Sequence, residues 1–141
     1  MDWKLELVIV PVTDVDRAKK FYTEQLGFAE DVDHSAGDSF RVVQLTPPGS
    51  ACSITIGTGL TTATPGAYQG THLVVKDIEA ARAELVERGV EVSEPFHFTA
   101  EGQQPGVDPN RAKYGSYLTF SDPDGNGWTV QEVPEPTPDR Q

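Results

Sequence analysis

The hydrophobic and polar positions of this chain repeat one order twice. Residues 4–12 are mostly apolar and β-branched, which predicts a buried strand. A helical spacing of apolar residues follows and predicts an amphipathic helix whose buried face is formed by Val15, Ala18, Tyr22 and Leu26. The strand predicted over residues 71–75 is followed by a second such face, formed by Ile78, Ala81, Leu85 and Val86. A repeat of this size predicts two related halves.

Each predicted helix is bounded by residue types that begin and end helices. Asp14 and Asp77 precede the two helices, where a carboxylate can accept a hydrogen bond from a free backbone N–H group. Gly27 and Gly89 follow them, where glycine tolerates the left-handed conformation that ends a helix. The order of strand, Asp, helix and Gly therefore defines a module that occurs twice.

Three strand-like segments follow each helix. They cover residues 28–34, 39–46 and 51–57 in the first half, and 90–96, 115–121 and 127–133 in the second. Each half is thus predicted to be a βαβββ module, and the chain an α+β protein. Residues 97–114 are predicted to form a long loop, a kind of segment that often acts as a lid.

These segments predict one domain over residues 1–133. Module one covers residues 4–57, a linker residues 58–69, and module two residues 70–133. The Pro-rich residues 134–141 are expected to form a disordered tail.

Composition narrows the classes of partner. The formal net charge is −11, from 11 Lys and Arg residues against 22 Asp and Glu residues. This balance argues against a nucleic-acid or anionic-membrane surface and permits a cationic ligand. Cys52 is the single cysteine, so no disulfide within the chain and no cysteine-based metal site is expected. No apolar run is long enough for a signal peptide or a membrane span, so a cytoplasmic location is expected.

Three motifs resemble the vicinal oxygen chelate superfamily. They are the stretch from Val12 to Tyr22 with Leu26-Gly27-Phe28, the stretch from His72 to Ala81, and the stretch from Phe120 to Asn126. The superfamily includes glyoxalase I, extradiol dioxygenases, methylmalonyl-CoA epimerase, and bleomycin- and fosfomycin-resistance proteins. The resemblance covers residues 4–133 and implies paired βαβββ modules forming a cupped sheet around a ligand, in a homodimer. It does not transfer a reaction.

The resemblance also implies where a metal would be bound. Enzymes of the superfamily place one His, Glu or Gln on each of four strands, and these ligands hold a divalent cation. The corresponding positions here are Leu7, Thr55, Gly70 and Thr129. Since none of these is such a ligand, we predict no metal site and no cofactor. A two-residue shift in the alignment would keep the strand faces and change the residues, so a metal-dependent member is the alternative.

Strand alternation predicts which side chains face the cup. His72 shares a face with Gly70, and its ring could orient a ligand or transfer a proton near neutral pH. The structural alternative is a histidine hydrogen-bonded to a neighbouring strand. Alternation also predicts that Leu7, Ile9, Thr55, Thr129 and Gln131 bind the ligand, and Gln44 could add a polar anchor. Phe96 and Tyr114 are predicted to bind it from in or beside the loops around the mouth of the cup, where Phe98 also lies; packing in the core or lid is the alternative for these aromatic residues. The opposite faces are predicted to form the core, with Val8, Val10, Ile54, Ile56, Trp128 and Val130.

The run from Asp122 to Gly127 nearly matches the spacing of a calcium-binding loop. Its flanks read as strands, however, and Val133 occupies the position where a calcium loop has Glu. A hairpin turn is therefore predicted.

Two functions from different classes remain. The favoured hypothesis is a metal-free protein that binds and sequesters a small organic molecule. The alternative is a glyoxalase-like lyase or isomerase that uses His72 as a catalytic acid or base.

Overall fold

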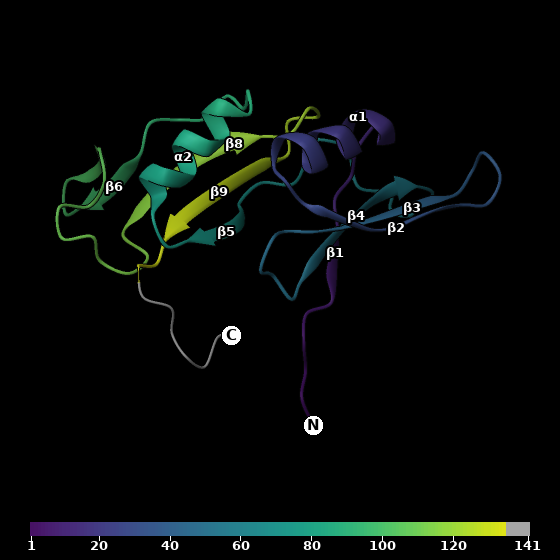
Figure 1. Cartoon of the computed structure of the whole chain (residues 1–141), viewed down its shortest axis with the longest axis horizontal. Coiled ribbons are helices and arrows are strands. Elements are labelled where there is room, and N and C mark those ends of the chain that lie inside the picture. Colours follow the sequence, from purple (N-terminus) through teal and green to yellow (C-terminus); the bar gives the residue numbers. More distant parts are fainter. Residues whose placement is uncertain (135–141) are drawn as a thin grey trace. The chain divides into compact units, whose positions relative to one another are not determined.

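The computed structural model describes residues 1–134 and divides the chain into two compact units, each built on one sheet (Figure 1). The first unit comprises residues 1–69 and 122–126, and the second comprises residues 70–121 and those from 127 onward. The turn at 122–126, which the sequence places in module two, thus belongs to the first unit. The predicted tail, apart from Pro134, lies outside the described residues.

The first unit is a four-stranded sheet with a helical segment between its first two strands. Its elements are β1 (Leu7–Ile9), α1 (Val15–Lys20), η1 (Phe21–Gln25), β2 (Ala29–Ser35), β3 (Arg41–Thr46) and β4 (Ser53–Thr58). The spatial order of the strands is β1-β4-β3-β2, with β1 parallel to β4 and the other pairs antiparallel. This is the βαβββ order predicted from the sequence.

The first helix begins and ends where the sequence predicts, but its last turn is wider. The Asp14 carboxylate accepts a hydrogen bond from the backbone N–H of Arg17 at 3.0 Å, and Gly27 has a φ of 75°. Between them, α1 passes into the π-helical turn η1. Both Phe21 and Tyr22 are buried there, so two neighbouring rings point inward where a regular α-helix would separate them.

The second unit is a five-stranded sheet with one helix. Its elements are β5 (Thr71–Val75), α2 (Ile78–Glu87), β6 (Phe96–Thr99), β7 (Gly102–Pro105), β8 (Ser116–Ser121) and β9 (Gly127–Glu132). The spatial order is β5-β9-β8-β6-β7, with β5 parallel to β9. The Asp77 carboxylate caps α2 by accepting hydrogen bonds from the N–H groups of Glu79 and Ala80, each at 3.1 Å. Figure 1 shows α2 lying along β8 and β9.

Three details predicted for the second half are wrong. The strand expected over residues 90–96 begins at Phe96, directly after Pro95, which has no N–H to donate to a strand pair; before it, Val92 forms an isolated bridge with Phe120. The loop expected over residues 97–114 contains the β6–β7 hairpin. Val86 is 50% exposed, because it lies one residue past the stripe formed by Ile78 and Leu85 and is rotated away from the sheet.

The core of each unit lies between its helix and the helix-facing side chains of its strands. The most buried of these are Val10, Val43, Leu45, Ile54 and Ile56 in the first unit, and Leu118, Phe120, Trp128 and Val130 in the second. Each stabilises the fold by about 1.5–3 kcal/mol relative to an exposed position. Phe120 and Trp128 are partners in the β8–β9 register, and their rings stack with centroids 6.1 Å apart. Val8, also predicted to be core, is only partly buried.

Within residues 1–134, no helix has the length and apolar character needed to cross a membrane.

Candidate functional site

One face of the five-stranded sheet is turned away from α2. Trp128, Val130 and Glu132 point toward the helix, and the Glu132 carboxylate accepts a hydrogen bond from the backbone N–H of Ile78 at 3.0 Å. Alternate side chains along every strand therefore point the other way. We call this other side the open face; its strand residues are His72, Val74, Phe96, Phe98, Gln103, Pro105, Tyr117, Thr119, Thr129 and Gln131.

Three aromatic rings form a cluster on the open face. Phe96 and Tyr117 are partners in the β6–β8 register, and their rings lie 5.7 Å apart at an interplanar angle of 21°. Phe98 contacts both rings edge-on, at 5.9 Å from Phe96 and 5.6 Å from Tyr117. The Phe98 side chain is nevertheless 57% exposed. A ring fixed by two neighbours thus offers apolar surface to solvent.

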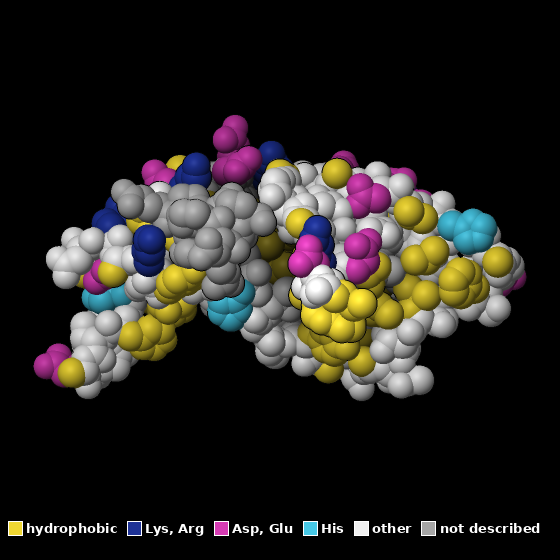
Figure 2. Space-filling view, turned by 90° about the horizontal axis from the view of Figure 1, so that it is seen from below, with side chains coloured by type: hydrophobic (Ala, Val, Ile, Leu, Met, Phe, Trp, Pro, Cys, Tyr) yellow, Lys and Arg dark blue, Asp and Glu magenta, His cyan; other side chains and the backbone are white. Residues whose placement is uncertain are grey.

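Figure 2 views the structure from below the orientation of Figure 1, and it shows hydrophobic (yellow) and histidine (cyan) side chains on both halves of the picture.

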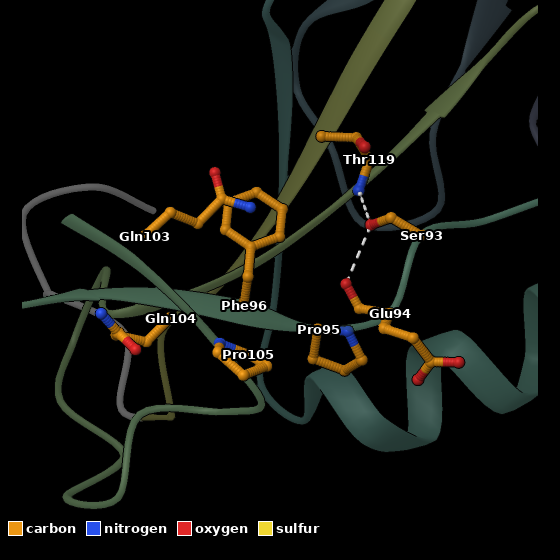
Figure 3. A pocket seen from close by; sticks show the side chains of 8 residues that line it. All are labelled: Ser93, Glu94, Pro95, Phe96, Gln103, Gln104, Pro105 and Thr119. Atoms are coloured by element: carbon orange, nitrogen blue, oxygen red, sulfur yellow. Dashed lines mark hydrogen bonds between the residues drawn. The ribbon is translucent and has the colours of Figure 1, made fainter.

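A surface hollow of about 610 Å³ lies beside the aromatic cluster (Figure 3). Its lining consists of Ser93, Glu94, Pro95, Phe96, Gln103, Gln104, Pro105 and Thr119. Ser93 fixes one rim, because its hydroxyl accepts a hydrogen bond from the N–H of Thr119 at 2.9 Å and donates one to the carbonyl of Glu94 at 3.0 Å. Phe96 and the two prolines are its apolar residues, and the other five residues supply hydroxyl, amide and carboxylate groups that can orient a ligand.

The loop at residues 106–115 holds one ring of the cluster in place. The Tyr117 hydroxyl donates a hydrogen bond to the Tyr114 carbonyl at 2.5 Å, and the N–H of Tyr114 donates to the carbonyl of Glu132 at 2.9 Å. Arg111 and Tyr114 both have left-handed backbones, with φ of 48° and 60°. Such a conformation costs about 1–3 kcal/mol at a residue other than glycine, so contacts elsewhere must stabilise the loop.

The side chain of Arg111 makes the contacts that stabilise the loop. Its Nε donates to Oε1 of Glu132 at 2.8 Å, its Nη2 donates to the other carboxylate oxygen, and its Nη1 donates to Glu79 at 2.9 Å. Glu132 is fully buried. The hydrogen bonds from Arg111, and then that from the N–H of Ile78, hold the pKa of the Glu132 carboxyl below its usual range despite burial.

The sequence-predicted residues of the second half lie on or next to the open face. His72 is exposed and paired across the strands with Thr129, and its Nδ1 contacts the carbonyl oxygen of Gly70. Phe96, Thr129 and Gln131 are partly exposed on the same face. Tyr114 lies in the neighbouring loop rather than on a strand. Their contact with a ligand stays a prediction.

The predicted residues of the first half lie together on the face of the four-stranded sheet turned away from its core. Leu7 pairs with Ser53, and Thr55 is the partner of both Ile9 and Gln44. The amide of Gln44 donates to the Ser53 hydroxyl at 3.3 Å. The Thr55 hydroxyl is buried and has no hydrogen-bond partner among the described residues. A role for this face in ligand binding also stays a prediction.

The four positions that correspond to the family's metal ligands carry side chains of other types. Leu7 and Gly70 have no ligating atom, and Thr55 and Thr129 offer hydroxyls rather than an imidazole or a carboxylate. Among residues 1–134, no group of three or more His, Cys, Asp or Glu side chains is placed to hold a metal ion.

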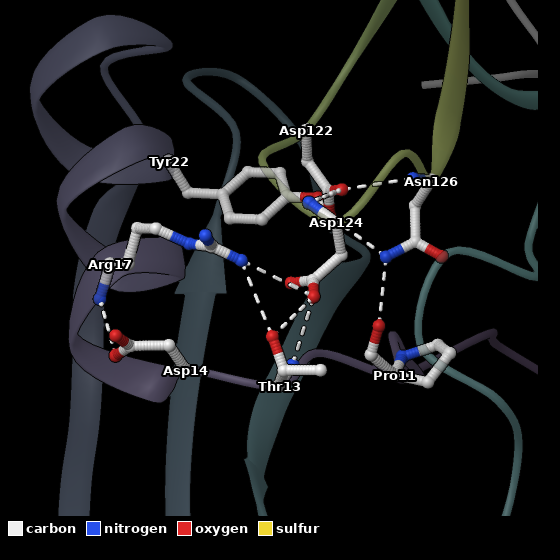
Figure 4. A network of polar contacts seen from close by, with 8 residues as sticks. All are labelled: Pro11, Thr13, Asp14, Arg17, Tyr22, Asp122, Asp124 and Asn126. Atoms are coloured by element: carbon white, nitrogen blue, oxygen red, sulfur yellow. Dashed lines mark hydrogen bonds and ion pairs between the residues drawn. The ribbon is translucent and has the colours of Figure 1, made fainter.

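The run that nearly matches a calcium loop forms the predicted hairpin turn (Figure 4). The Asp122 carboxylate accepts hydrogen bonds from the Tyr22 hydroxyl at 2.7 Å and from the N–H groups of Asp124 and Asn126 at 2.9 Å. The Asn126 amide donates to the carbonyl of Pro11 at 2.8 Å. These side chains therefore fix the turn against the start of the chain, which is a structural role.

The chain belongs to the Glyoxalase/Bleomycin resistance protein/Dioxygenase superfamily, whose family model matches residues 4–130. It is similar to TnmS3, an antibiotic binding protein from Streptomyces sp. CB03234, with 33% identity, a TM-score of 0.72, and coverage of 93% of this chain and 96% of that one. A superfamily member from Sphaerobacter thermophilus DSM 20745 is 29% identical, with a TM-score of 0.72 and coverage of 94% and 98%. The protein YetH of Bacillus subtilis (strain 168) is 28% identical over 129 residues, which are 89% of this chain and 94% of YetH.

Proposed function

We propose that this protein binds a small organic molecule on the open face of its second unit, without a metal and without transforming the molecule. The observation that carries the proposal is the hollow of about 610 Å³ beside the exposed ring of Phe98. Apolar surface removed from water by a ligand contributes about 25 cal/mol per Å². The hydroxyl and amide groups around the hollow would fix the ligand's orientation.

The comparisons support binding rather than a particular reaction. TnmS3 is described as an antibiotic binding protein, and its 33% identity extends over nearly the whole of this chain. The superfamily also contains enzymes, and a shared fold does not decide between the two roles. By analogy, sequestration of an antibiotic-like molecule is the role that we propose here.

An enzymatic role is the second candidate, and His72 is the residue that favours it. His72 lies on the open face opposite Thr129, where it could reach a bound molecule. Among the described residues, however, no carboxylate is paired with its ring to orient or activate it. Binding without turnover is therefore the simpler function for this face.

Two further expectations belong to this proposal. The first is a homodimer, because Trp3 and Leu5 are 89% and 69% exposed and continue the alternation of Leu7 and Ile9 toward the start of the chain. A second copy of the chain would remove these side chains from water. The second is a cytoplasmic location, which cell fractionation would test.

A ligand screen tests the proposed function. Thermal unfolding of the purified protein would be followed against a library of antibiotics and metabolites, and compounds that stabilise it would be titrated by calorimetry. We expect binding of about one ligand per chain with the ligand recovered unchanged. Chemical conversion of the bound compound would favour the enzymatic candidate, and a library without any stabilising compound would contradict both.

Phe98→Ala and Phe40→Ala provide a matched pair of variants for the screen. Both remove an exposed ring, but Phe40 lies in the first unit, before β3. We expect ligand affinity to fall in Phe98→Ala and to stay unchanged in Phe40→Ala. Equal affinities in the two variants would place the ligand away from the aromatic cluster.

A further inference from the structure

We infer that the ligand of the open face is an uncharged, planar, conjugated molecule. The inference rests on the proposed function and names the chemical class that this face selects. Two independent properties of the face carry the inference. One is the fixed arrangement of its rings, and the other is the absence of Asp, Glu, Lys and Arg from its strand residues.

The first property is a fixed aromatic surface. Phe98 is held edge-on by Phe96 and Tyr117, with centroids 5.6–5.9 Å away. Tyr117 is held in turn by its hydrogen bond to the Tyr114 carbonyl. Rings that are already fixed lose little conformational freedom when a ligand binds. A flat ring system can lie against them in an offset or edge-on contact worth about 0.5–1.5 kcal/mol beyond its burial, which a puckered saturated ring cannot make.

The second property is the chemistry of the polar groups on the open face. Gln103 and Gln131 present amides, and Thr119 and Thr129 present hydroxyls, all of which can both donate and accept hydrogen bonds. The strand residues of the face include no Asp, Glu, Lys or Arg, and His72 and Tyr117 are the titratable side chains among them. A charged ligand buried here would lack an opposite charge, which is costly.

Two charged side chains near this face, Glu94 and Glu132, have other partners, while Glu101, in the turn between β6 and β7, is exposed. Glu94, at the rim of the hollow, is strongly exposed and pairs with Arg82 at 3.2 Å. The Glu132 carboxylate points to the opposite side of the sheet, where Arg111 and Ile78 bind it. The net charge of −11 therefore does not describe the binding face, and the cationic ligand that composition permits is not what this face selects.

The size of the hollow is compatible with this class of molecule. Its volume of about 610 Å³ falls within the ~300–1,000 Å³ typical of small-molecule sites.

A panel of four bicyclic compounds tests the inference on the full-length protein. 2-Naphthalenemethanol is planar and neutral, 2-naphthylmethylammonium carries a positive charge, 2-naphthoate carries a negative charge, and decahydronaphthalene-2-methanol is neutral but saturated. Calorimetric titration at pH 7.5 would compare their dissociation constants. We expect the planar neutral alcohol to bind about tenfold more tightly than each of the other three.

Two leucine variants locate the contact. Phe98→Leu keeps an apolar side chain and removes the ring, and Phe40→Leu does the same at an exposed ring of the first unit. We expect affinity for 2-naphthalenemethanol to fall about three- to tenfold in Phe98→Leu, in line with one lost ring contact, and to stay unchanged in Phe40→Leu.

Several results would overturn the inference. Equal binding of the saturated alcohol would refute the requirement for a planar ring, and tighter binding of either ion would refute neutrality; in both cases the proposed binding function would stand. Equal effects of the two leucine variants would refute the aromatic cluster as the contact. No binding by any member would refute the ligand class, while the library screen described above decides the function itself.

Discussion

Arg111, whose backbone is left-handed, donates a hydrogen bond from Nε to Oε1 of the fully buried Glu132 at 2.8 Å. The same carboxylate accepts the N–H of Ile78 at the start of α2. The pair therefore connects the loop at residues 106–115, the helix and β9 within the second unit. It lies behind the open face, so it acts on the aromatic cluster by holding Tyr114 and Tyr117 rather than by touching a ligand.

Removing Arg111 should destabilise the fold more than removing the charge of Glu132. Arg111→Met leaves an unpaired carboxylate in the interior, with an expected loss of about 2–3 kcal/mol, below the ~3–5 kcal/mol of fully buried pairs because Arg111 is 38% exposed. Glu132→Gln leaves the cation free to contact water and should cost less. Urea unfolding measures both. Glu84→Gln, in an exposed pair with Arg88, is the matched control and should change stability by less than about 0.5 kcal/mol.

The stability contributed by Glu132 should depend on pH. Its pKa is lower in the folded protein than its ordinary value of 4.5, mainly because Arg111 donates hydrogen bonds to the carboxylate. The contribution is therefore fully present above about pH 4.5 and is lost as the pH falls through the lower folded pKa. Urea unfolding of wild type and Glu132→Gln between pH 3 and pH 7 should show their difference shrinking at low pH. If the difference in stability between the two proteins did not change with pH, the charge of the Glu132 carboxylate would not be the source of the stabilisation.

The hydroxyl of Tyr22 should matter for stability although it is remote from the open face. Tyr22→Phe removes the donor that reaches the buried Asp122 carboxylate at 2.7 Å, with an expected loss of about 1–3 kcal/mol. Tyr114→Phe, at an exposed ring, is the control. Thermal or urea unfolding compares the two variants. Equal stability would argue that the network of Figure 4 does not stabilise the hairpin turn.

His72→Ala separates the two candidate functions. If the protein only binds its ligand, loss of this exposed ring should change the dissociation constant by less than about fivefold, as for most contact residues outside an energetic hot spot. If His72 is an acid or base, turnover should fall by about 10²–10⁴-fold while binding persists. Calorimetry and product analysis on the same variant give both readouts. Full turnover by His72→Ala would exclude the acid–base mechanism.

The proposed homodimer depends on the exposed start of the chain. Sedimentation equilibrium should give twice the chain mass of 15.3 kDa for the wild type. Replacing Trp3 and Leu5 with serine should shift the protein toward the monomer. Val86→Ser, which changes an exposed apolar residue on α2, should leave the mass unchanged. A monomeric wild type would refute this part of the proposal.

Local signals explain why much of the fold could be predicted from the sequence. Asp14 and Asp77 cap their helices, and Gly27 and Gly89 follow them with positive φ, because each of these roles depends on a few neighbouring residues. The β6–β7 hairpin was not predicted, because its second strand is polar and carries no alternation of apolar residues.

The candidate site was predicted only where alternation along one strand was enough. Alternation placed Thr129 and Gln131 on one face together with His72, and the three share a face in the structure; their contact with a ligand stays a prediction. Phe98 was placed beside the mouth of the cup but not chosen as a binding residue, and Tyr117 was missed, because their contact depends on the pairing of β6 with β8 across a long connection. Glu132 carried one usable signal: it alternates with Trp128 and Val130 on the buried face, so a cationic partner was required, but alternation could not identify Arg111.

The turn at residues 122–126 has a consequence for how this protein can be divided. It belongs to the first unit, where it binds Pro11, Thr13 and Tyr22, while the strands on either side of it belong to the second. A fragment ending at Gln69 would thus contain a complete βαβββ module and still lack the side chains that close it. Cutting the chain at the boundary between the two sequence repeats would therefore separate the first unit from its own turn.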